Sequence, residues 1–222
     1  MANNVSQIKS IDLRDASYPY LLKQIPDPPQ KLYYRGTLTN FHWQNQQFLA
    51  IVGSRHPSFY GLKIAQEWSL ALAKAGIVLV SGLALGIDTV VHQSALKVGA
   101  STIAVLGCAI DKVYPKQNQS LYQQIINHHG LVISEFKPNE TISRLRFVTR
   151  NRIITGLCKA VLLIEGTSKS GTLATARYAG QQGREVLALP GRVNDSLAQA
   201  PLLMLKQGAT LVLNPQEVIE AL

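Results

Sequence analysis

Seven short, continuous runs of apolar residues recur along the chain from Phe48 onward. They are Phe48–Val52, Ile77–Val80, Thr102–Leu106, Leu131–Ile133, Ala160–Ile164, Glu185–Leu189 and Thr210–Leu213. Continuous rather than alternating apolar positions are typical of strands that are buried on both faces. Most runs are separated by helical stretches, and in one of these four apolar residues share a face: Leu62, Ala65, Trp68 and Leu72. The pattern predicts an α/β fold, with a doubly wound, mostly parallel sheet and helices on both of its faces.

The first 45 residues follow another pattern. Pro19 and the prolines between Ile25 and Pro29 cannot lie inside helices or central strands, because proline lacks the amide donor. We expect residues 1–45 to form an irregular arm with one short helix, and residues 46–222 to form the main domain. Apolar side chains would pack the arm on that domain: Leu13, Leu21, Leu22, Leu32, Tyr33 and Tyr34.

Composition narrows the class of protein. Hydrophobic residues make up 46% of the 222 residues, which excludes wholesale disorder, and the formal net charge of +9 favours a polyanionic partner. Two cysteines without metal or redox spacing exclude a disulfide scaffold. Met1–Asp15 lacks the apolar stretch of a secretion signal, and the most apolar run, Ala75–Ile87, is too short to span a bilayer. We expect a cytoplasmic protein without a membrane partner.

Glycines and small polar residues follow three of the predicted strands, in Gly53–Arg55, Ser81–Asp88 and Glu165–Thr172. In such sheets ligands bind beyond the carboxyl ends of the strands, where helix N-termini attract anions. We therefore expect phosphate-binding loops made of Gly53, Ser54, Ser81, Gly82, Gly86, Ser170, Gly171 and Thr172, with Lys169 close by. An ordinary turn is the alternative at Gly53–Arg55. Asp88 is expected to cap its helix or to orient neighbouring loops rather than to act in catalysis.

A basic segment between Lys137 and Lys159 is the strongest local signal. It holds six basic residues, Lys137, Arg144, Arg146, Arg150, Arg152 and Lys159, and one acid, Glu140, with Phe147 and Asn151 among the arginines. Arginines clamp phosphates, and an aromatic ring stacks on unpaired bases. The alternative is a solvated basic face with Phe147 in the core. We expect the arginines to face outward, so that replacing Arg150 and Arg152 by glutamate would weaken DNA binding without unfolding the protein.

Enzyme signatures are weak. Five scattered histidines form no zinc-hydrolase pair: His42, His56, His92, His128 and His129. No Gly-x-Ser-x-Gly element is present, and Cys108 and Cys158 are interpreted as small core residues. We expect no catalytic residue, no metal and no cofactor.

Together these segments resemble the DprA/Smf family of DNA-processing proteins. The matching stretches are Asp27–Gly36, Ile51–Arg55, Ser81–Asp88, Ile103–Cys108, Tyr114-Pro115, Ser134–Phe136, Phe147–Ile154, Ser170–Ala176 and Pro190-Gly191. The resemblance implies an extended Rossmann-like domain that binds single-stranded DNA in natural transformation, protects the incoming strand and helps to load the RecA recombinase. It also implies a homodimer and no enzymatic activity.

Carried onto this sequence, the resemblance places DNA contacts at Arg55, Arg144, Phe147, Arg150, Asn151 and Arg152. Lys169, beside the predicted phosphate loop, completes the expected contact set. The chain departs from the family pattern at three places. Leu85 stands where an arginine is common, Val148 where a proline is common, and Ala200–Leu202 where a Gly-x-Asn element is usual.

Two alternatives stay open. Gly166–Ala176 also resembles the phosphate loop of nucleoside-monophosphate phosphoribohydrolases, but Leu173 stands where those enzymes place a glutamate, and Glu165 precedes the loop. The other alternative is a domain whose natural ligand is a small nucleotide. Leu202–Leu205 is apolar and could belong to the core or to an interface.

Overall fold

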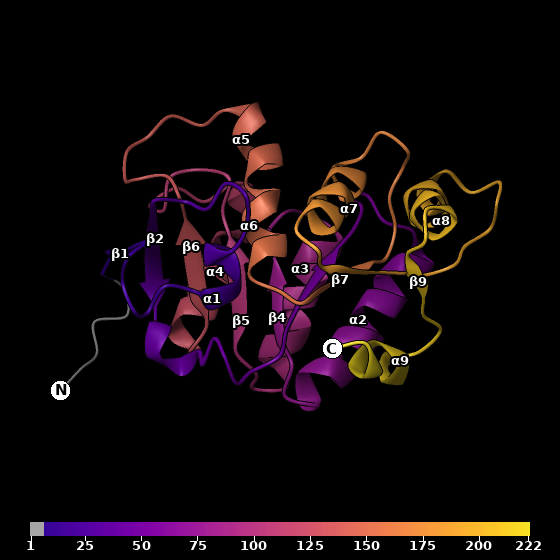
Figure 1. The fold of residues 1–222 in the computed structure, drawn as a ribbon, viewed down its shortest axis with the longest axis horizontal. Coiled ribbons are helices and arrows are strands. Elements are labelled where there is room, and N and C mark those ends of the chain that lie inside the picture. The colour runs from indigo at the N-terminus through magenta and orange to yellow at the C-terminus, as the bar shows by residue number, and fades with distance from the viewer. Residues whose placement is uncertain (1–6) are drawn as a thin grey trace.

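The computed structural model describes residues 7–222, and a nine-stranded sheet runs through them (Figure 1). The strands are β1 (Lys9–Asp12), β2 (Lys31–Gly36), β3 (Phe48–Val52), β4 (Val78–Ser81), β5 (Thr102–Val105), β6 (Leu131–Ser134), β7 (Ala160–Leu163), β8 (Glu185–Ala188) and β9 (Thr210–Leu211). All seven predicted strands are present, each within a residue or two of its expected end, and the predicted fold class is confirmed.

Nine α-helices connect the strands in the described part of the chain. They are α1 (Tyr20–Lys23), α2 (Phe59–Lys74), α3 (Ile87–Lys97), α4 (Gln119–Asn127), α5 (Arg144–Thr149), α6 (Asn151–Gly156), α7 (Gly171–Gln181), α8 (Gln199–Lys206) and α9 (Pro215–Glu220). Short 3-10 turns lie at Leu38–Asn40, Lys116–Asn118 and Ser196–Ala198. None of these helices is both long enough and apolar enough to span a membrane.

The order of the strands in the sheet is β1-β2-β6-β5-β4-β3-β7-β8-β9. The chain builds outward from β3 through β4 and β5 to β6, then returns through α5 and α6 to place β7 on the other side of β3. Strands β3 to β9 are parallel to one another. The order therefore reverses between β3 and β7, and a crevice for a ligand is expected at such a switch point.

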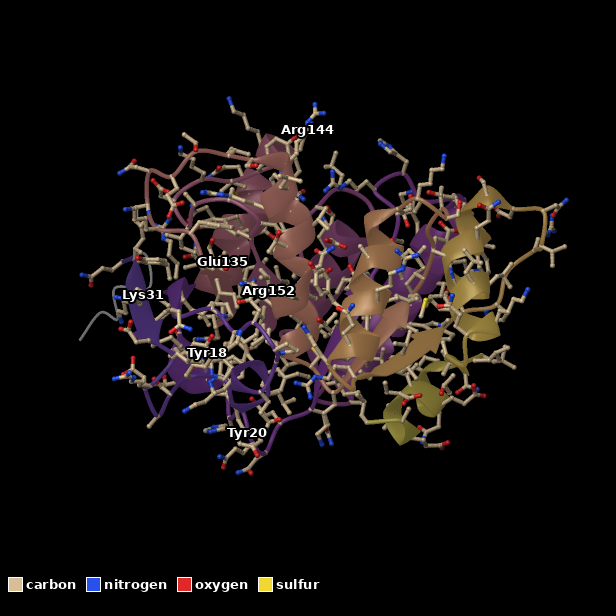
Figure 2. All side chains as sticks on the ribbon, turned by 45° about the horizontal axis from the view of Figure 1, so that its top comes forward. Tyr18, Tyr20, Lys31, Glu135, Arg144 and Arg152 are labelled. Atoms are coloured by element: carbon tan, nitrogen blue, oxygen red, sulfur yellow. The ribbon has the colours of Figure 1, made fainter. Side chains whose placement is uncertain are left out.

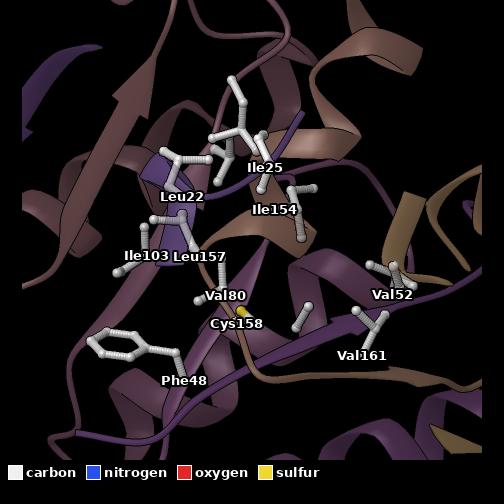
Figure 3. Close-up of a cluster of buried hydrophobic side chains, with 14 of the residues drawn as sticks. Leu22, Ile25, Phe48, Val52, Val80, Ile103, Ile154, Leu157, Cys158 and Val161 are labelled. Atoms are coloured by element: carbon white, nitrogen blue, oxygen red, sulfur yellow. The ribbon is translucent and has the colours of Figure 1, made fainter. Parts of the chain in front are cut away.

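Alternate strand residues point to opposite faces and build separate cores. Ala50, Val80 and Val161 face α6 and α7, whereas Leu49, Leu79 and Leu162 face α2 and α3. Figure 3 shows part of the first core, in which Leu22 of the arm packs with Leu157 and Cys158. A third cluster packs α4 against β5 and β6 and contains Cys108. Both cysteines are buried, as predicted.

The prediction of an irregular arm is wrong for two segments. β2 pairs with β6 and β1 pairs with β2, both antiparallel, so the arm extends the sheet by two strands. The prolines lie between these strands, with Pro19 at the start of α1. The arm nevertheless contains one α-helix and buries Leu22 and Leu32, as expected. Residues 1–6 of the expected arm lie outside the described residues, and the division of the chain at residue 45 stays a prediction.

The predicted apolar face of α2 is wrong at one residue. Ala65, Trp68 and Leu72 are buried, but Leu62 is 37% exposed. Gly61 is buried in its place and lies against Glu165. A Cβ there would be 2.3 Å from the Glu165 carboxylate, so no larger residue fits. A buried polar contact thus sets the register of this helix, which a pattern of apolar residues does not record.

Candidate nucleic-acid interface

The loops that follow the parallel strands meet at one edge of the sheet, together with α5 and the start of α7 (Figure 1). Ile87 N donates to Ser54 O at 3.2 Å, which ties the loop after β4 to the loop after β3. Asn151 Nδ2 donates to Gly171 O at 3.5 Å, which ties α6 to α7. The sequence-predicted residues are therefore brought to one edge, but they do not all face solvent there.

Arg150 is buried, and the prediction that it faces outward is wrong. Its side chain is 4% exposed, and its Nη1 donates to the backbone oxygens of Gly82, at 2.8 Å, and Val105. Its Nε donates to Asn151 Oδ1 at 3.1 Å, and Asn151 is buried as well. A Cβ at Gly82 would lie 2.5 Å from the guanidinium, so this glycine admits Arg150 rather than a ligand. Arg150 links the start of α6 to the ends of β4 and β5.

Asp88 occupies the amides that we expected to face a phosphate. Its Oδ2 accepts from Gly82 N at 3.1 Å and from Ala84 N at 3.2 Å, so it orients the loop, which is one of its two predicted structural roles. The other role, a helix cap, is wrong, because the N-cap of α3 is Gly86, with no side-chain capping hydrogen bond among the described residues. Ser81 is fully buried and donates to Ile51 O at 2.8 Å. Ser81 and Gly82 therefore stabilise the loop, and their prediction as phosphate ligands does not fit the structure.

Asp88 and Arg150 form a buried pair of opposite charges. Burial raises the pKa of Asp88, and the Arg150 charge opposes that rise. Burial lowers the pKa of Arg150 to about 10, against the opposing effect of Asp88, and the charge of Arg55 lowers it further. Arg55 therefore lies close enough to Arg150 for their charges to interact.

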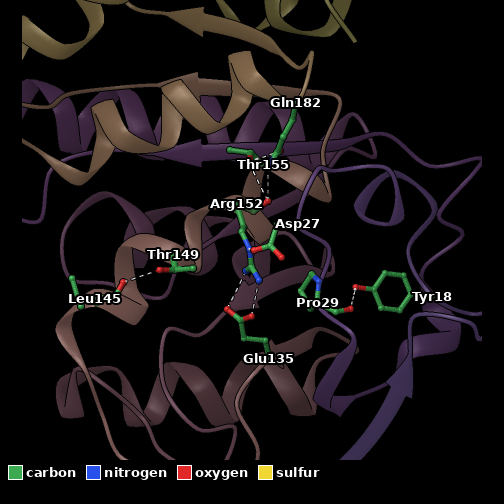
Figure 4. A network of polar contacts seen from close by, with 9 residues as sticks. All are labelled: Tyr18, Asp27, Pro29, Glu135, Leu145, Thr149, Arg152, Thr155 and Gln182. Carbon is green, nitrogen blue, oxygen red and sulfur yellow. Dashed lines mark hydrogen bonds and ion pairs between the residues drawn. The ribbon is translucent and has the colours of Figure 1, made fainter.

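Arg152 also faces inward, contrary to prediction. Its guanidinium holds Glu135 through two hydrogen bonds, Nη1 to Oε1 at 3.0 Å and Nη2 to Oε2 at 2.7 Å. Its Nε donates to Asp27 of the arm at 2.9 Å (Figure 4). Because the charge of Arg152 is paired on both sides, it ties α6 to the arm and is not available to a phosphate.

Three of the predicted cationic residues, Arg55, Arg144 and Lys169, are exposed. Arg144 stands at the outer end of α5 (Figure 2). Phe147 is half-buried and packs on the loop after β5, because a Cβ at Gly107 would lie 2.7 Å from its ring. These four residues are the part of the predicted DNA contact set that this arrangement leaves accessible.

Gly53 of the loop after β3 and Gly86 of the loop after β4 are required for packing. A Cβ at Gly53 would lie 2.5 Å from Ile87, and one at Gly86, where φ is +78°, would lie 2.4 Å from Ser54 O. Ser54 Oγ accepts from His56 N at 3.1 Å. Gly53 and Gly86 therefore hold two loops together, which is the ordinary-turn alternative, and they leave Arg55 exposed above them.

The start of α7 is open to solvent at this edge. Gly171 is exposed, and a Cβ there would meet none of the described atoms within 4 Å. Ser170 Oγ is shielded from solvent without a hydrogen-bond partner among the described residues, while Thr172 Oγ1 donates to Glu165 O at 3.4 Å. Backbone amides at this helix N-terminus and the nearby Lys169 suit an anion.

Glu165, which follows β7, binds the start of α2 rather than the start of α7. Its carboxylate accepts from Ser58 N at 2.9 Å and from Ser58 Oγ at 2.5 Å, at the start of α2. It also lines a pocket of about 670 Å³ whose rim includes Phe59, Tyr60 and Arg192. Hydrogen bonds between Gly166 and the 197–200 segment join this pocket to the α7 loop.

Sequence reasoning did not find Glu135 and Asp27 as partners of Arg152, nor the cavity that receives Arg150. Glu135 belongs to a matched stretch, Ser134–Phe136, and an acid beside a buried strand end was the available signal. Nothing local to Gly82 or Val105 marks them as partners of an arginine 45 to 68 residues away.

Comparisons with known proteins agree with this architecture. The sequence model of the family described as DNA recombination-mediator protein A matches residues 9–222. DNA processing protein DprA of Bacillus subtilis is 36% identical over 215 residues, which are 97% of this chain and 71% of that protein. The chain belongs to the DprA/Smf family.

Other relatives fit the same assignment. Protein Smf of Synechocystis sp. is 42% identical over 209 residues, and the chain spans only 52% of its length. The crystal structure of DprA from Streptococcus pneumoniae superposes with a TM-score of 0.89 at 38% identity, covering 97% of this chain and 75% of that one.

A structure of Helicobacter pylori DNA processing protein A, which concerns its single-stranded DNA binding mode, gives a TM-score of 0.86 at 30% identity and covers 96% of this chain and 94% of that one. The molybdenum cofactor binding protein of Rippkaea orientalis, with a TM-score of 0.56 at 17% identity over 80% of this chain and 95% of that one, shares the fold alone.

Proposed function

We propose that this DprA/Smf family protein binds single-stranded DNA along the carboxyl edge of its sheet, without acting on it as an enzyme. The observation that carries the proposal is that three exposed cations and a half-buried aromatic residue stand at the same edge of the sheet as the open start of α7: Arg55, Arg144, Lys169 and Phe147. Cations beside an aromatic ring bind single strands with little regard to sequence, because phosphates and stacking faces carry no base code. The single-stranded DNA binding of the Helicobacter pylori relative supports the proposal.

The contact set that we propose is smaller than the one predicted from the sequence. It consists of Arg55, Arg144, Phe147 and Lys169 as side chains, with Ser170, Gly171 and Thr172 at the helix start. Arg150, Asn151 and Arg152 support these residues from beneath, since their polar groups are already paired within the protein.

The wider role is part of the same proposal. The protein would protect incoming single strands in natural transformation and help to load a RecA recombinase, in the cytoplasm and as a homodimer. The family's description as a recombination mediator supports this role.

A salt titration tests the proposal. For a labelled oligonucleotide, the logarithm of the binding constant should fall linearly with the logarithm of the salt concentration. The slope should be about −0.7 for each phosphate contact on a single strand. Arg144→Ala should weaken binding about tenfold and reduce the slope by about one contact. Lys74→Ala removes the same charge at the C-terminal end of α2, at the opposite edge, and should change neither quantity. Equal effects of the two variants would show that only the net charge of the protein matters for binding, and would contradict the proposed site.

A second candidate is a small nucleotide, favoured by the 670 Å³ pocket beside the α7 loop. In that case AMP or ADP should displace the oligonucleotide at low concentration, and a released base after incubation with AMP would favour an enzyme of the phosphoribohydrolase type. We expect neither. Glu165 is the acid nearest that loop in sequence, and both of its carboxylate oxygens are engaged by Ser58.

A further inference from the structure

Tyr114 is a half-exposed aromatic residue beside Phe147. It follows β5 in the loop that also contains Gly107, and 48% of its surface is exposed. The two ring centroids lie 5.2 Å apart and the ring planes are tilted by 48°. This distance is within the range of favourable aromatic pairs. One ring thus supports the other, while much of Tyr114 stays open to solvent.

Both rings stand on fixed elements. Phe147 is seated against Gly107, where any larger residue would collide with it. Arg146 holds the start of α5 through Glu140, Nη2 to Oε2 at 2.9 Å, and its guanidinium lies 4.1 Å from the centre of the Phe136 ring. Lys112, in the loop of Tyr114, donates through Nζ to Glu140 O at 2.9 Å. The same acidic residue therefore anchors both α5 and the loop of Tyr114.

The surroundings of the pair are cationic. Arg144 is three residues before Phe147 on α5, so the two side chains lie on neighbouring positions of one helix face. Lys116 is two residues after Tyr114, and both cationic side chains are exposed. An open aromatic surface among cations matches an unpaired base with its phosphate, because bases inside a duplex are stacked on one another and offer no face to a side chain.

We propose that Tyr114 stacks on a base of the bound single strand and forms, with Phe147, a platform of two aromatic rings. This inference rests on the proposed function and extends it to a residue outside the predicted contact set. It assigns a binding role to the Tyr114-Pro115 stretch, for which the sequence supplied only a resemblance.

The test compares Tyr114→Ala, Tyr114→Leu and Tyr114→Phe for binding to labelled oligothymidylate and to a strand of equal length in which abasic residues replace the nucleosides. On the normal strand, Tyr114→Ala and Tyr114→Leu should each bind about tenfold more weakly, the size expected for one stacked base, and Tyr114→Phe should bind like the parent. On the abasic strand all four proteins should bind equally, because the ring has no base to contact.

Tyr20→Ala is the matched control. Tyr20 is 51% exposed and lies on α1, away from the edge that carries Arg144 (Figure 2), so its removal should leave both affinities unchanged. Thermal unfolding of each variant checks that the half-exposed ring of Tyr114 is not needed for folding, and Tyr114→Leu preserves apolar volume at the site.

Three outcomes would overturn the inference. If Tyr114→Ala binds the normal strand like the parent while Arg144→Ala binds weakly, Tyr114 lies off the path of the strand and the proposed function stands. If Tyr114→Ala weakens the normal and the abasic strand alike, the ring shapes the loop and contacts no base. If the parent protein does not bind single-stranded DNA, the proposed function and the inference fail together.

Discussion

Arg150 illustrates how one residue can carry a basic charge without presenting it to a ligand. Its guanidinium lies among backbone carbonyls, with the Asp88 carboxylate as the balancing charge. Breaking a buried pair of charges is costly because the partner is left without compensation in a medium of low dielectric constant. Arg150 therefore stabilises this edge of the sheet, although its position among other basic residues in the sequence suggests a DNA contact.

Arg150→Ala should lower the free energy of unfolding by about 3–5 kcal/mol, since it leaves Asp88 uncompensated and two backbone oxygens without donors. Urea unfolding followed by circular dichroism measures the change. Arg144→Ala, on the exposed end of α5, should stay within about 0.5 kcal/mol of the parent. A stable Arg150→Ala protein that has merely lost DNA binding would restore the outward-facing interpretation.

His92 is a second residue whose surroundings decide its chemistry. It is fully buried on α3, and its Nδ1 lies 2.8 Å from Thr102 Oγ1. The Thr102 hydroxyl donates to Leu79 O, so Nδ1 must carry the proton and donate to Thr102. Nε2 has no partner among the described residues. Burial, assisted by the charge of Arg150, lowers the pKa of His92 to about 3.

The protein should therefore lose stability in acid through His92. Below about pH 6.5 the unfolded chain protonates this imidazole, whereas the folded protein does not until about pH 3, so stability is present above this window and is lost as pH falls through it. The slope contributed is on the order of 1.4 kcal/mol per pH unit. Unfolding titrations of the parent and His92→Gln should differ by that slope. His128→Gln, on the surface, is the control for the substitution.

At the scale of elements, Arg152 of α6 has two unequal partners, one in the loop after β6 and one in the arm. Glu135 and Asp27 both bind Arg152, but the side chain of Glu135 is 16% exposed and that of Asp27 is 78% exposed. Solvent screens the second pair, so the two contacts should differ in energy although their distances are similar. Figure 4 shows the three side chains where α6, the loop after β6 and the arm meet.

Glu135→Ala should destabilise the protein by about 3 kcal/mol, whereas Asp27→Ala should cost no more than about 1 kcal/mol. Both values come from urea unfolding, and a double-mutant cycle with Arg152→Ala isolates each pair. Equal costs for the two substitutions would show that burial does not set the strength of these contacts.

Elements were predictable where the pattern of side chains is strong. The central strands are buried on both faces, and their continuous apolar runs locate them within a residue or two. β2 was missed because it is not buried on both faces. Leu32 is buried, while Lys31 and Tyr33 on either side of it are partly exposed, so the strand has no continuous apolar run. Its partner in the sheet, β6, lies about a hundred residues further along the chain, and no local signal records that pairing.

At the scale of the molecule, the meeting of the predicted loops at one edge was predictable, and the orientation of their side chains was not. Parallel strands place their carboxyl ends at one edge, which brought the expected loops together. Whether an arginine there faces solvent depends on acceptors outside its own segment, such as Val105 O for Arg150 and the Glu135 carboxylate for Arg152. A count of basic residues therefore overstated the accessible charge by including Arg150 and Arg152.

The direct passage of α5 into α6 at Arg150 has a mechanical consequence. A strand held at Arg144 and then drawn along by other machinery would pull on α5, and the force would pass along a nearly continuous helical rod. The rod is clasped at its midpoint by the ends of β4 and β5, through Gly82 and Val105. Tension on the polymer would thus pass into the central sheet rather than stretch a loop.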